Sequence, residues 1–329
     1  MTILSARGVG RHRSAQSAEI TWDACRKDDW NDLIDAAPDA AFEQTWMYGD
    51  AYATSSPAAL VRRAVVAAAN GAPIALAQVF TRRIGPIVTV AQLLRGPVLL
   101  RRDAIERDLS TSVMLLRSAL RQEGRSLFFW TPDTLDPTAV SATARAHRMH
   151  PVVTGHSSAQ LDLTRATDDM RRGLHVKWRN ALTQAEAGPL RIESKGGRRA
   201  AAWLLERYGT LRRSRRFGGP SAEMLGAVID GIPKHETVLL RAIAEGEAVG
   251  GALFLQHGRN ASYVIGWTDP AARALNAGTL LLWKGILTLK ERGIASLDLG
   301  GIDTRDAAGI ARFKLGVGGA PYTLPGTFL

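Results

Sequence analysis

The sequence has 329 residues, of which 46% are hydrophobic and 22% charged, so a sizeable core can form and the length indicates two domains. A single cysteine, Cys25, excludes a disulfide within the chain and a metal site built from several thiolates. The 42 Lys and Arg outnumber the 31 Asp and Glu, and the resulting net charge of +11 favours anionic partners.

The first half of the chain begins with a basic segment, residues 1–18, which we expect to be flexible and which lacks the apolar run of a secretion signal. Residues 20–60 show a helical pattern. Asn70-Gly71, between two apolar segments, predicts a β-hairpin. The elements expected next are the two hairpin strands (61–69 and 73–80), a strand over 96–100, a helix over 105–121 and a strand over 127–130.

The second half repeats this order of elements. It contains a hairpin with strands 241–244 and 249–256, a strand over 261–267, a helix over 278–292, and a strand over 296–299. We interpret the repeat as a duplication of one mixed α/β unit, although two common α/β patterns could also coincide. The predicted domains are residues 19–150 and 151–329.

Familiar catalytic and metal-binding motifs are absent from the sequence. It contains no Gly-x-Ser-x-Gly, no His-Glu-x-x-His and no Walker loop, and its 7 histidines show no metal-ligand spacing. No apolar segment approaches the ~20 residues that a membrane helix requires. We therefore expect a cytoplasmic protein without a metal, and peripheral membrane contact stays open.

Residues 297–319 form the most informative stretch. Leu297 and Leu299 alternate with Asp298, which predicts a short strand that ends at Gly300-Gly301. An aromatic residue and a cation, Phe313 and Lys314, follow on a segment that is bracketed by glycines and predicted to be a loop. Because glycine accepts positive φ, such a loop could bring its backbone close to a ligand.

Positive charge is concentrated between Arg165 and Arg216, where 14 Lys and Arg face 5 Asp and Glu. On a continuous helix, Arg172, His175 and Arg179 would lie on one side, an arrangement suited to phosphate contacts. A basic run before Gly218-Gly219-Pro220 indicates an anion-gathering loop. Two structural interpretations of these residues stay open. The basic segment as a whole could be a charged surface that keeps the protein in solution. The helix with Arg172 and Arg179 could be solvated, with Trp178 in the core.

These stretches resemble the Fem family of aminoacyl-tRNA-dependent peptidyl transferases. The resemblance is carried by Asp298-Leu299-Gly300-Gly301-Ile302-Asp303, Gly309, Phe313-Lys314-Leu315-Gly316, Gly318-Gly319, Lys177-Trp178-Arg179-Asn180 and Arg216-Phe217. It implies an α/β fold of two tandem GNAT-like acyltransferase domains. The long helical arm of some family members is missing from this chain.

The resemblance also implies a reaction, in which an acceptor amine attacks the ester of an aminoacyl-tRNA. An ester is already activated, so positioning and oxyanion stabilisation can supply most of the acceleration. Lys314 would neutralise phosphate or the developing oxyanion, and Asp298 and Asp303 would orient or deprotonate the amine. Phe313 would stack on the terminal nucleotide. The remaining residues predicted to bind donor or substrate are Arg273, Asn276, Gly300, Gly301, Lys177, Trp178, Arg179, Asn180, Arg216 and Phe217.

Two alternative functions stay open. The loop from Arg273 to Gly278 resembles an eroded pyrophosphate cradle of acyl-CoA-dependent GNAT enzymes, in which Asn276 replaces the first glycine. Acyl-CoA is therefore the alternative donor, and no tightly bound cofactor is expected with either one. Expected partners are tRNA and an amine-bearing acceptor, either a peptidoglycan precursor or a small metabolite. The second alternative is a non-catalytic protein that binds nucleic acid or another polyanion.

Overall fold

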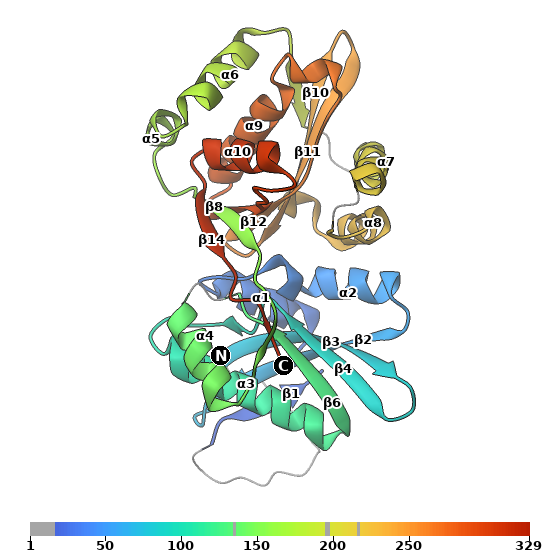
Figure 1. The fold of residues 1–329 in the computed structure, drawn as a ribbon, viewed down its shortest axis with the longest axis vertical. Helices are drawn as coiled ribbons and strands as arrows, with labels where there is room; N and C mark the ends of the chain where they lie inside the picture. Colours follow the sequence, from blue (N-terminus) through green and yellow to red (C-terminus); the bar gives the residue numbers. More distant parts are fainter. Residues whose placement is uncertain (1–16, 134–135, 195–197, 216–217) are drawn as a thin grey trace.

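The computed structural model describes residues 17–133, 136–194, 198–215 and 218–329. Two mixed β-sheets with flanking helices follow one another along the long axis of the molecule (Figure 1). Within the described residues, no helix is both long and apolar enough to cross a bilayer. The predicted lead-in, residues 1–18, lies almost wholly outside the described residues, as do Arg216 and Phe217.

The first sheet has the strand order β1-β2-β3-β4-β6-β15-β7, with β5 paired to β3. Its strands are β1 (Glu19–Trp22), β2 (Ala59–Ala67), β3 (Pro73–Ile84), β4 (Val88–Leu94), β5 (Val98–Leu99), β6 (Arg125–Thr131), β7 (Pro151–Val153) and β15 (Thr327–Phe328). Its helices are α1 (Lys27–Ala36), the 3-10 helix η1 (Phe42–Gln44), α2 (Trp46–Ser55), α3 (Ile105–Gln122) and α4 (Pro137–Ala146). α3 and α4 share one apolar core with this sheet, and α1 packs in another.

The second sheet has the order β14-β8-β13-β12-β11-β10-β9. Its strands are β8 (Ser157–Asp162), β9 (Arg191–Ser194), β10 (Thr237–Ala244), β11 (Glu247–His257), β12 (Asn260–Thr268), β13 (Ser296–Gly301) and β14 (Ala320–Thr323). The accompanying helices are α5 (Thr167–Arg172), α6 (Val176–Ala187), α7 (Arg198–Arg215), α8 (Ala222–Gly231), η2 (Lys234–Glu236), η3 (Ala271–Arg273), α9 (Ala277–Glu291) and α10 (Ala308–Gly316).

Side-chain alternation along β10 and β11 separates the helices of the second sheet into two layers. Leu240 and Phe254 point to the core that contains α6 and α9. Leu239 and Leu253, their neighbours in sequence, point to the core that contains α7 and α8. This second core also includes Phe42 and Phe80 of the first domain, so apolar side chains join the two domains here.

The duplication predicted from the sequence is present in the fold. In the first domain, β2, β3 and β4 are antiparallel neighbours, and β6 returns parallel to β4 after α3. In the second domain, β10, β11 and β12 are antiparallel neighbours, and β13 returns parallel to β12 after α9. The hairpin expected at Asn70-Gly71 is confirmed, with Gly71 at φ 83°. The chain is therefore a mixed α/β protein whose two domains share the same order of strands and helix.

Two predicted segments differ from the structure. The helical pattern over 20–60 corresponds to the short strand β1, the helices α1 and α2 and a 3-10 turn, because Pro38 and the polar residues around it interrupt the helix. The segment around Phe313 and Lys314 is the helix α10 and not a loop. Among its bracketing glycines, Gly300 and Gly318 adopt positive φ.

The chain crosses between the two sheets twice, and the crossings lie against each other. Residues 154–156 lead from β7 to β8, while residues 324–326 lead from β14 back to β15. The Leu324 amide donates to the His156 carbonyl at 3.0 Å. A Cβ atom on Gly155 would lie 1.6 Å from the Leu324 carbonyl oxygen, so glycine is required for this close backbone contact. The predicted boundary at residue 150 lies just before the first crossing.

Candidate functional site

A wedge opens in the second sheet between its two parallel strands. β12 and β13 pair only from Asn260 to Ser262, although β12 continues to Thr268 and β13 to Gly301. A register shift leaves Val264 without a Cα partner on β11 at this point. In the first domain, the equivalent strands β4 and β6 stay paired along their whole length, from Val88 to Leu94. Of these two parallel pairs, the one in the second domain therefore leaves strand backbone free for a ligand.

Lys314 reaches from α10 toward this wedge. Its Nζ donates to the Gly301 carbonyl at 2.9 Å and would lie 3.3 Å from a Cβ atom on Gly300. The Tyr263 carbonyl oxygen, on β12, is 3.7 Å from the same Cβ position. The ammonium group thus lies near backbone of both strands, and a side chain at residue 300 would displace it.

The surroundings of Lys314 change its acidity. Burial lowers the pKa of Lys314 from 10.5 to about 8, while the charge of Asp298 opposes this change. Lys314 therefore loses its proton more readily than an exposed lysine does. A lysine with a lowered pKa, next to unpaired backbone of β12 and β13, is a candidate for binding negative charge or transferring a proton.

Asp298 lies on β13 and is surrounded by donors. Its Oδ1 accepts from Ser158 Oγ at 2.7 Å and from the Gly300 amide at 2.8 Å. Its Oδ2 accepts from Arg95 Nη1 at 3.1 Å and from Tyr322 Oη at 3.0 Å. Burial alone would raise the pKa of Asp298, but Arg95 and these hydrogen bonds hold it below its usual value. Because both oxygens are occupied, the carboxylate orders the wedge and is unsuited to the proton transfer that the sequence suggested.

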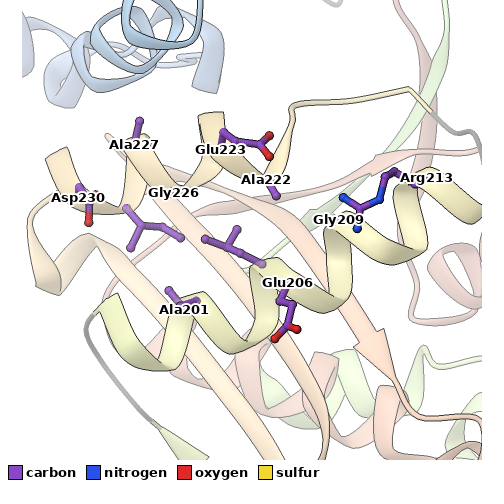
Figure 2. A pocket seen from close by; sticks show the side chains of 12 residues that line it. Ala201, Glu206, Gly209, Arg213, Ala222, Glu223, Gly226, Ala227 and Asp230 are labelled. Atoms are coloured by element: carbon purple, nitrogen blue, oxygen red, sulfur yellow. The ribbon is translucent and has the colours of Figure 1, made fainter.

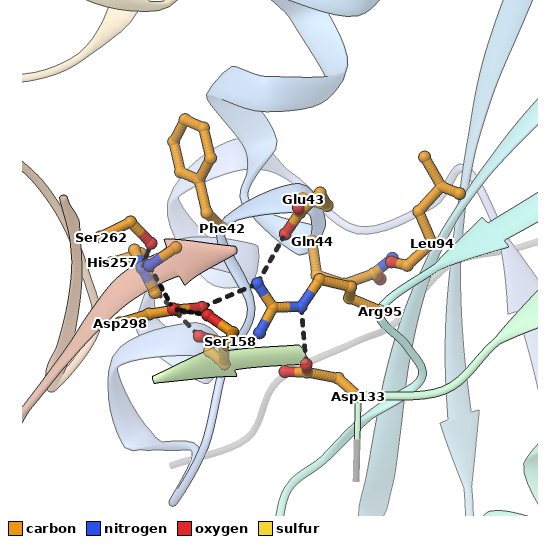
Figure 3. A network of polar contacts seen from close by, with 12 residues as sticks. Phe42, Glu43, Gln44, Leu94, Arg95, Asp133, Ser158, His257, Ser262 and Asp298 are labelled. Carbon is orange, nitrogen blue, oxygen red and sulfur yellow. Dashed lines mark hydrogen bonds and ion pairs between the residues drawn. The ribbon is translucent and has the colours of Figure 1, made fainter. Parts of the chain in front are cut away.

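Arg95 joins the two domains at this carboxylate (Figure 3). It belongs to the first domain, where its Nε donates to Asp133 at 2.6 Å and its Nη1 lies 3.7 Å from Glu43. Burial alone would lower the pKa of Arg95, but the three carboxylates raise it well above its usual value. Burial, with the charges of Glu43 and Asp298, raises the pKa of Asp133 to about 7 against the opposing effect of Arg95. Of this cluster, only Asp298 was predicted from the sequence.

Phe313 and Trp178 form part of the packing beneath the wedge. Their ring centroids are 6.0 Å apart, and the Trp178 indole donates to the Phe313 carbonyl at 3.1 Å. Trp178 is 6% exposed and also packs edge-on against Trp283 of α9. Trp178 is therefore a core residue, which corrects its predicted role in substrate binding. Phe313 is half-buried and packs against the same core.

Asp303 lies outside the wedge. Its side chain is exposed and accepts from the amides of Arg305 at 2.8 Å and Asp306 at 2.9 Å. These backbone hydrogen bonds hold the pKa of Asp303 below its usual value. The carboxylate stabilises a turn before α10, and this position argues against a catalytic role.

The loop before α9 contains the predicted cradle residues. Asn276 caps α9 in the left-handed conformation at φ 55°, and its Nδ2 donates to Gln184 Oε1 of α6 at 3.3 Å. The first turn of α9 receives no hydrogen bond from a capping side chain. Arg273 is exposed at the end of η3. No capping side chain therefore competes for the amides at the start of α9, although Ala277 and Thr279 are buried there.

The basic segment 165–216 does not form one patch. α5 and α6 lie on the α9 side of the second sheet, and α7 lies on the opposite side (Figure 1). Gly173 ends α5, and His175 caps α6, so Arg172 and Arg179 are on different helices. Arg171 and Arg172 pair with Glu186 and Asp169. The cations without an ion pair in the described α5–α6 region include the exposed Lys177 and the half-buried Arg179, with Asn180 exposed beside them.

A separate hollow of about 560 Å³ lies between α7 and α8, on the side of the sheet away from Lys314 (Figure 2). Its floor is apolar and made of small residues such as Ala201, Gly209 and Gly226. Glu206 and Arg213 lie at its rim. The hollow contains none of the predicted catalytic, donor-binding or substrate-binding residues, although Arg213 belongs to the basic run before Gly218-Gly219-Pro220, and it is not part of the wedge.

Comparisons with known proteins agree with this architecture. Residues 168–322 match the family model of the acetyltransferase (GNAT) domain, and comparison with curated protein sequences gives no significant match. FemX aligns over 94% of this chain and 96% of its own, at 12% identity and a TM-score of 0.81. A tandem GNAT protein from the clavulanic acid biosynthesis pathway aligns over 94% and 98%, at 15% identity and a TM-score of 0.53. L-PGS from Bacillus licheniformis aligns over 88% and 92%, at 12% identity and a TM-score of 0.50.

The domain match and the fold support an acyltransferase built from two tandem GNAT-like domains, as the sequence predicted. Within that class, the fold is similar to that of FemX over nearly the full length of both chains. At these identities the structural likeness concerns the fold, so the donor and the acceptor must be argued from the site.

Proposed function

We propose that the protein transfers an aminoacyl group from aminoacyl-tRNA to an amine and thereby forms an amide bond. The observation that carries this proposal is the ammonium group of Lys314 in the wedge between β12 and β13, beside the Gly301 carbonyl. When an amine attacks an ester carbonyl in the wedge, negative charge grows on the carbonyl oxygen. The ester C–O bond then breaks, and the 3′-hydroxyl of the tRNA leaves with the proton that the amine loses. A preorganised cation at that position stabilises the charge without a covalent enzyme intermediate.

The neighbouring residues support a cationic role for Lys314. Asp298 is fixed by four donors and favours the protonated form of the lysine. Gly300, at φ 75°, leaves the space that the ammonium group needs. Both residues position Lys314, and neither has to exchange a proton during the reaction.

A donor carried on tRNA fits the surface next to the wedge. α6 begins beside the end of α10, where the His175 amide donates to the Gly316 carbonyl at 3.0 Å. Lys177 and Arg179, near this contact, and Arg312 on α10 carry no ion pair to another described residue. These cations can contact backbone phosphates while Phe313 offers part of its ring to a terminal base. The fold likeness to FemX over nearly the full length of both chains agrees with the family resemblance of the sequence.

The second candidate is an N-acyltransferase that uses acyl-CoA. It is favoured by the start of α9, where the first amides have no capping side chain and Asn276 already adopts a left-handed conformation. A pyrophosphate could bind these amides and the helix dipole. Lys314 would have the same function with either donor, so activity of the lysine variants does not separate the two candidates.

The test is transfer from labelled donors by the full-length protein. Aminoacyl-tRNA and acetyl-CoA are each incubated with peptidoglycan-precursor peptides and with small diamines, and amide products are measured by mass spectrometry. We expect product from aminoacyl-tRNA, and an about 100-fold loss for Lys314→Met, the range found when one oxyanion donor is removed. Replacement of Lys177 by glutamine should raise KM and leave kcat nearly unchanged. Product from acetyl-CoA alone would establish the second candidate, and binding of any polyanion without product would indicate a non-catalytic protein.

A further inference from the structure

Exposed apolar side chains gather at the tip of the β3–β4 hairpin in the first domain. Ile84 is 59% exposed and Ile87 is 64% exposed, and the Gly85-Pro86 turn between them is exposed as well. The hairpin projects from the body of the domain (Figure 1). Large aliphatic side chains at a projecting turn cannot be covered by their own domain, so their exposure calls for a partner.

The strands on either side each carry one exposed leucine at the same end of the sheet. Leu60 on β2 is 67% exposed and is in register with Thr81 of β3. Leu127 on β6 is 44% exposed and is in register with Val90 of β4. Both leucines therefore lie at the end of the sheet that carries the hairpin tip. Leu127 is on the same face as Ile84, and Leu60 is on the opposite face.

Three arginines frame the same end of the sheet. Arg82 and Arg83 immediately precede Ile84, and Arg125 is in register with Val88 just after the turn. All three are exposed, and none forms an ion pair with another described residue. The nearby carboxylate of Glu123 is already paired with Arg62 at 3.0 Å. The tip thus combines unpaired positive charge with exposed aliphatic groups.

We propose that this hairpin tip, residues 82–88 together with Leu60, Arg125 and Leu127, binds the surface of an anionic lipid bilayer. Aliphatic side chains enter the boundary between headgroups and acyl chains, while arginines remain at the level of the anionic headgroups. The tip projects as a turn that carries large aliphatic side chains, a shape that suits a deformable lipid surface better than a folded protein partner. The inference stands apart from the proposed transfer reaction and from the wedge.

Vesicle binding of the full-length protein tests the proposal. Sedimentation with phosphatidylglycerol vesicles and with phosphatidylcholine vesicles is measured at about 0.1 M salt, where surface charges still act over roughly 10 Å. The wild type should bind the anionic vesicles, and more salt should weaken the binding. Arg82→Gln with Arg83→Gln should reduce the partition coefficient about 30-fold, because each arginine at an anionic surface contributes roughly a factor of five. Ile84→Ser with Ile87→Ser should reduce it about tenfold.

Two controls separate the tip from the overall charge of the chain. Arg145 and Arg148 are exposed elsewhere in the first domain, and their replacement by glutamine removes the same charge. This pair should change vesicle binding by less than about twofold. A fluorophore at Ile87→Cys in a Cys25→Ala background should shift to shorter wavelength when anionic vesicles are added.

Several results would overturn the proposal. These are no binding of the wild type to phosphatidylglycerol vesicles, an equal loss for the Arg145 and Arg148 pair, or an unshifted fluorophore in the vesicle-bound protein. If the wild type is a dimer in solution and the double variant Ile84→Ser with Ile87→Ser is a monomer, the tip would instead bind a second copy of the chain. Transfer activity on soluble substrates should be the same in tip variants and wild type, so failure of this proposal is distinct from failure of the proposed function.

Discussion

Replacement of Lys314 by methionine should reduce transfer activity and at the same time increase the stability of the fold. The side chain keeps its apolar body but loses its charge. The decrease in the pKa of Lys314 from 10.5 to about 8 corresponds to roughly 3 kcal/mol against the charged form in the folded protein. Partial exposure and the lost hydrogen bond to the Gly301 carbonyl reduce the gain from removing that charge. We expect Lys314→Met to be more stable than wild type by about 1–2 kcal/mol at pH 7 while transfer falls about 100-fold.

The pH dependence follows from the same pKa. In the folded protein Lys314 releases its proton near pH 8, and in the unfolded chain it does so near its usual 10.5. Between these values the unfolded state binds more protons, so the wild type should gain stability as pH rises and the methionine variant should gain less. Transfer by the wild type should decline above about pH 8 because the cation is lost. Lys314→Arg keeps its charge and should retain a flat profile over this range.

Urea denaturation at pH 7 and pH 10, with single-turnover transfer measured from pH 6 to pH 9.5, would test these expectations. Full turnover by Lys314→Met would refute the role of the cation. If Lys314→Met is less stable than wild type at pH 7, the inference that burying the charge destabilises the folded protein is wrong. Activity that rises through pH 8 would show that the free amine is the active form and that Lys314 acts as a base.

The remaining predictions concern the core and the domain junction. Arg95→Gln should cost about 3–5 kcal/mol of unfolding free energy, because it leaves buried carboxylates without their counter-charge; a loss below about 1 kcal/mol in urea denaturation would contradict this. Trp178→Ala should lower the free energy of unfolding by about 3–5 kcal/mol, because the ring is packed in the core. Trp178→Phe should largely preserve stability and donor affinity. Loss of donor affinity at unchanged stability would instead support the predicted binding role of Trp178. Gly155→Ala should lower the Tm measured by calorimetry by several degrees, because the added Cβ atom would clash with the Leu324 carbonyl oxygen. An unchanged Tm would show that the two segments that connect the sheets, residues 154–156 and 324–326, can move apart.

The sequence predicted the elements whose signals are local. The Asn70-Gly71 turn, the helix from residue 105 and the strand with Leu297 and Leu299 all depend on neighbours in sequence, and the structure contains them. α10 was predicted as a loop because glycines surround it, yet the residues between them support a helix that packs on Trp178. Local signals also suggested one basic helix, whereas Gly173 divides it.

The interdomain cluster could not be predicted in this way. Arg95 bonds Asp133, Asp298 and Tyr322, which are 38, 203 and 227 residues away in the chain. None of these residues belongs to a short motif with the others, and only the stacking of two domains brings them together. Asp298 was found through its motif, but its saturation by four donors, and hence its ordering role, depends on residues from both domains.

The return of β15 to the first sheet affects how the chain can be synthesised. The Thr327 hydroxyl lies 2.8 Å from that of Thr131, 196 residues earlier, and Phe328 pairs with Trp130. While the ribosome is still translating the second domain, the edge of β6 therefore lacks its neighbour. An unpaired strand edge can join with other chains, so nascent molecules should depend on chaperone protection until translation reaches β15.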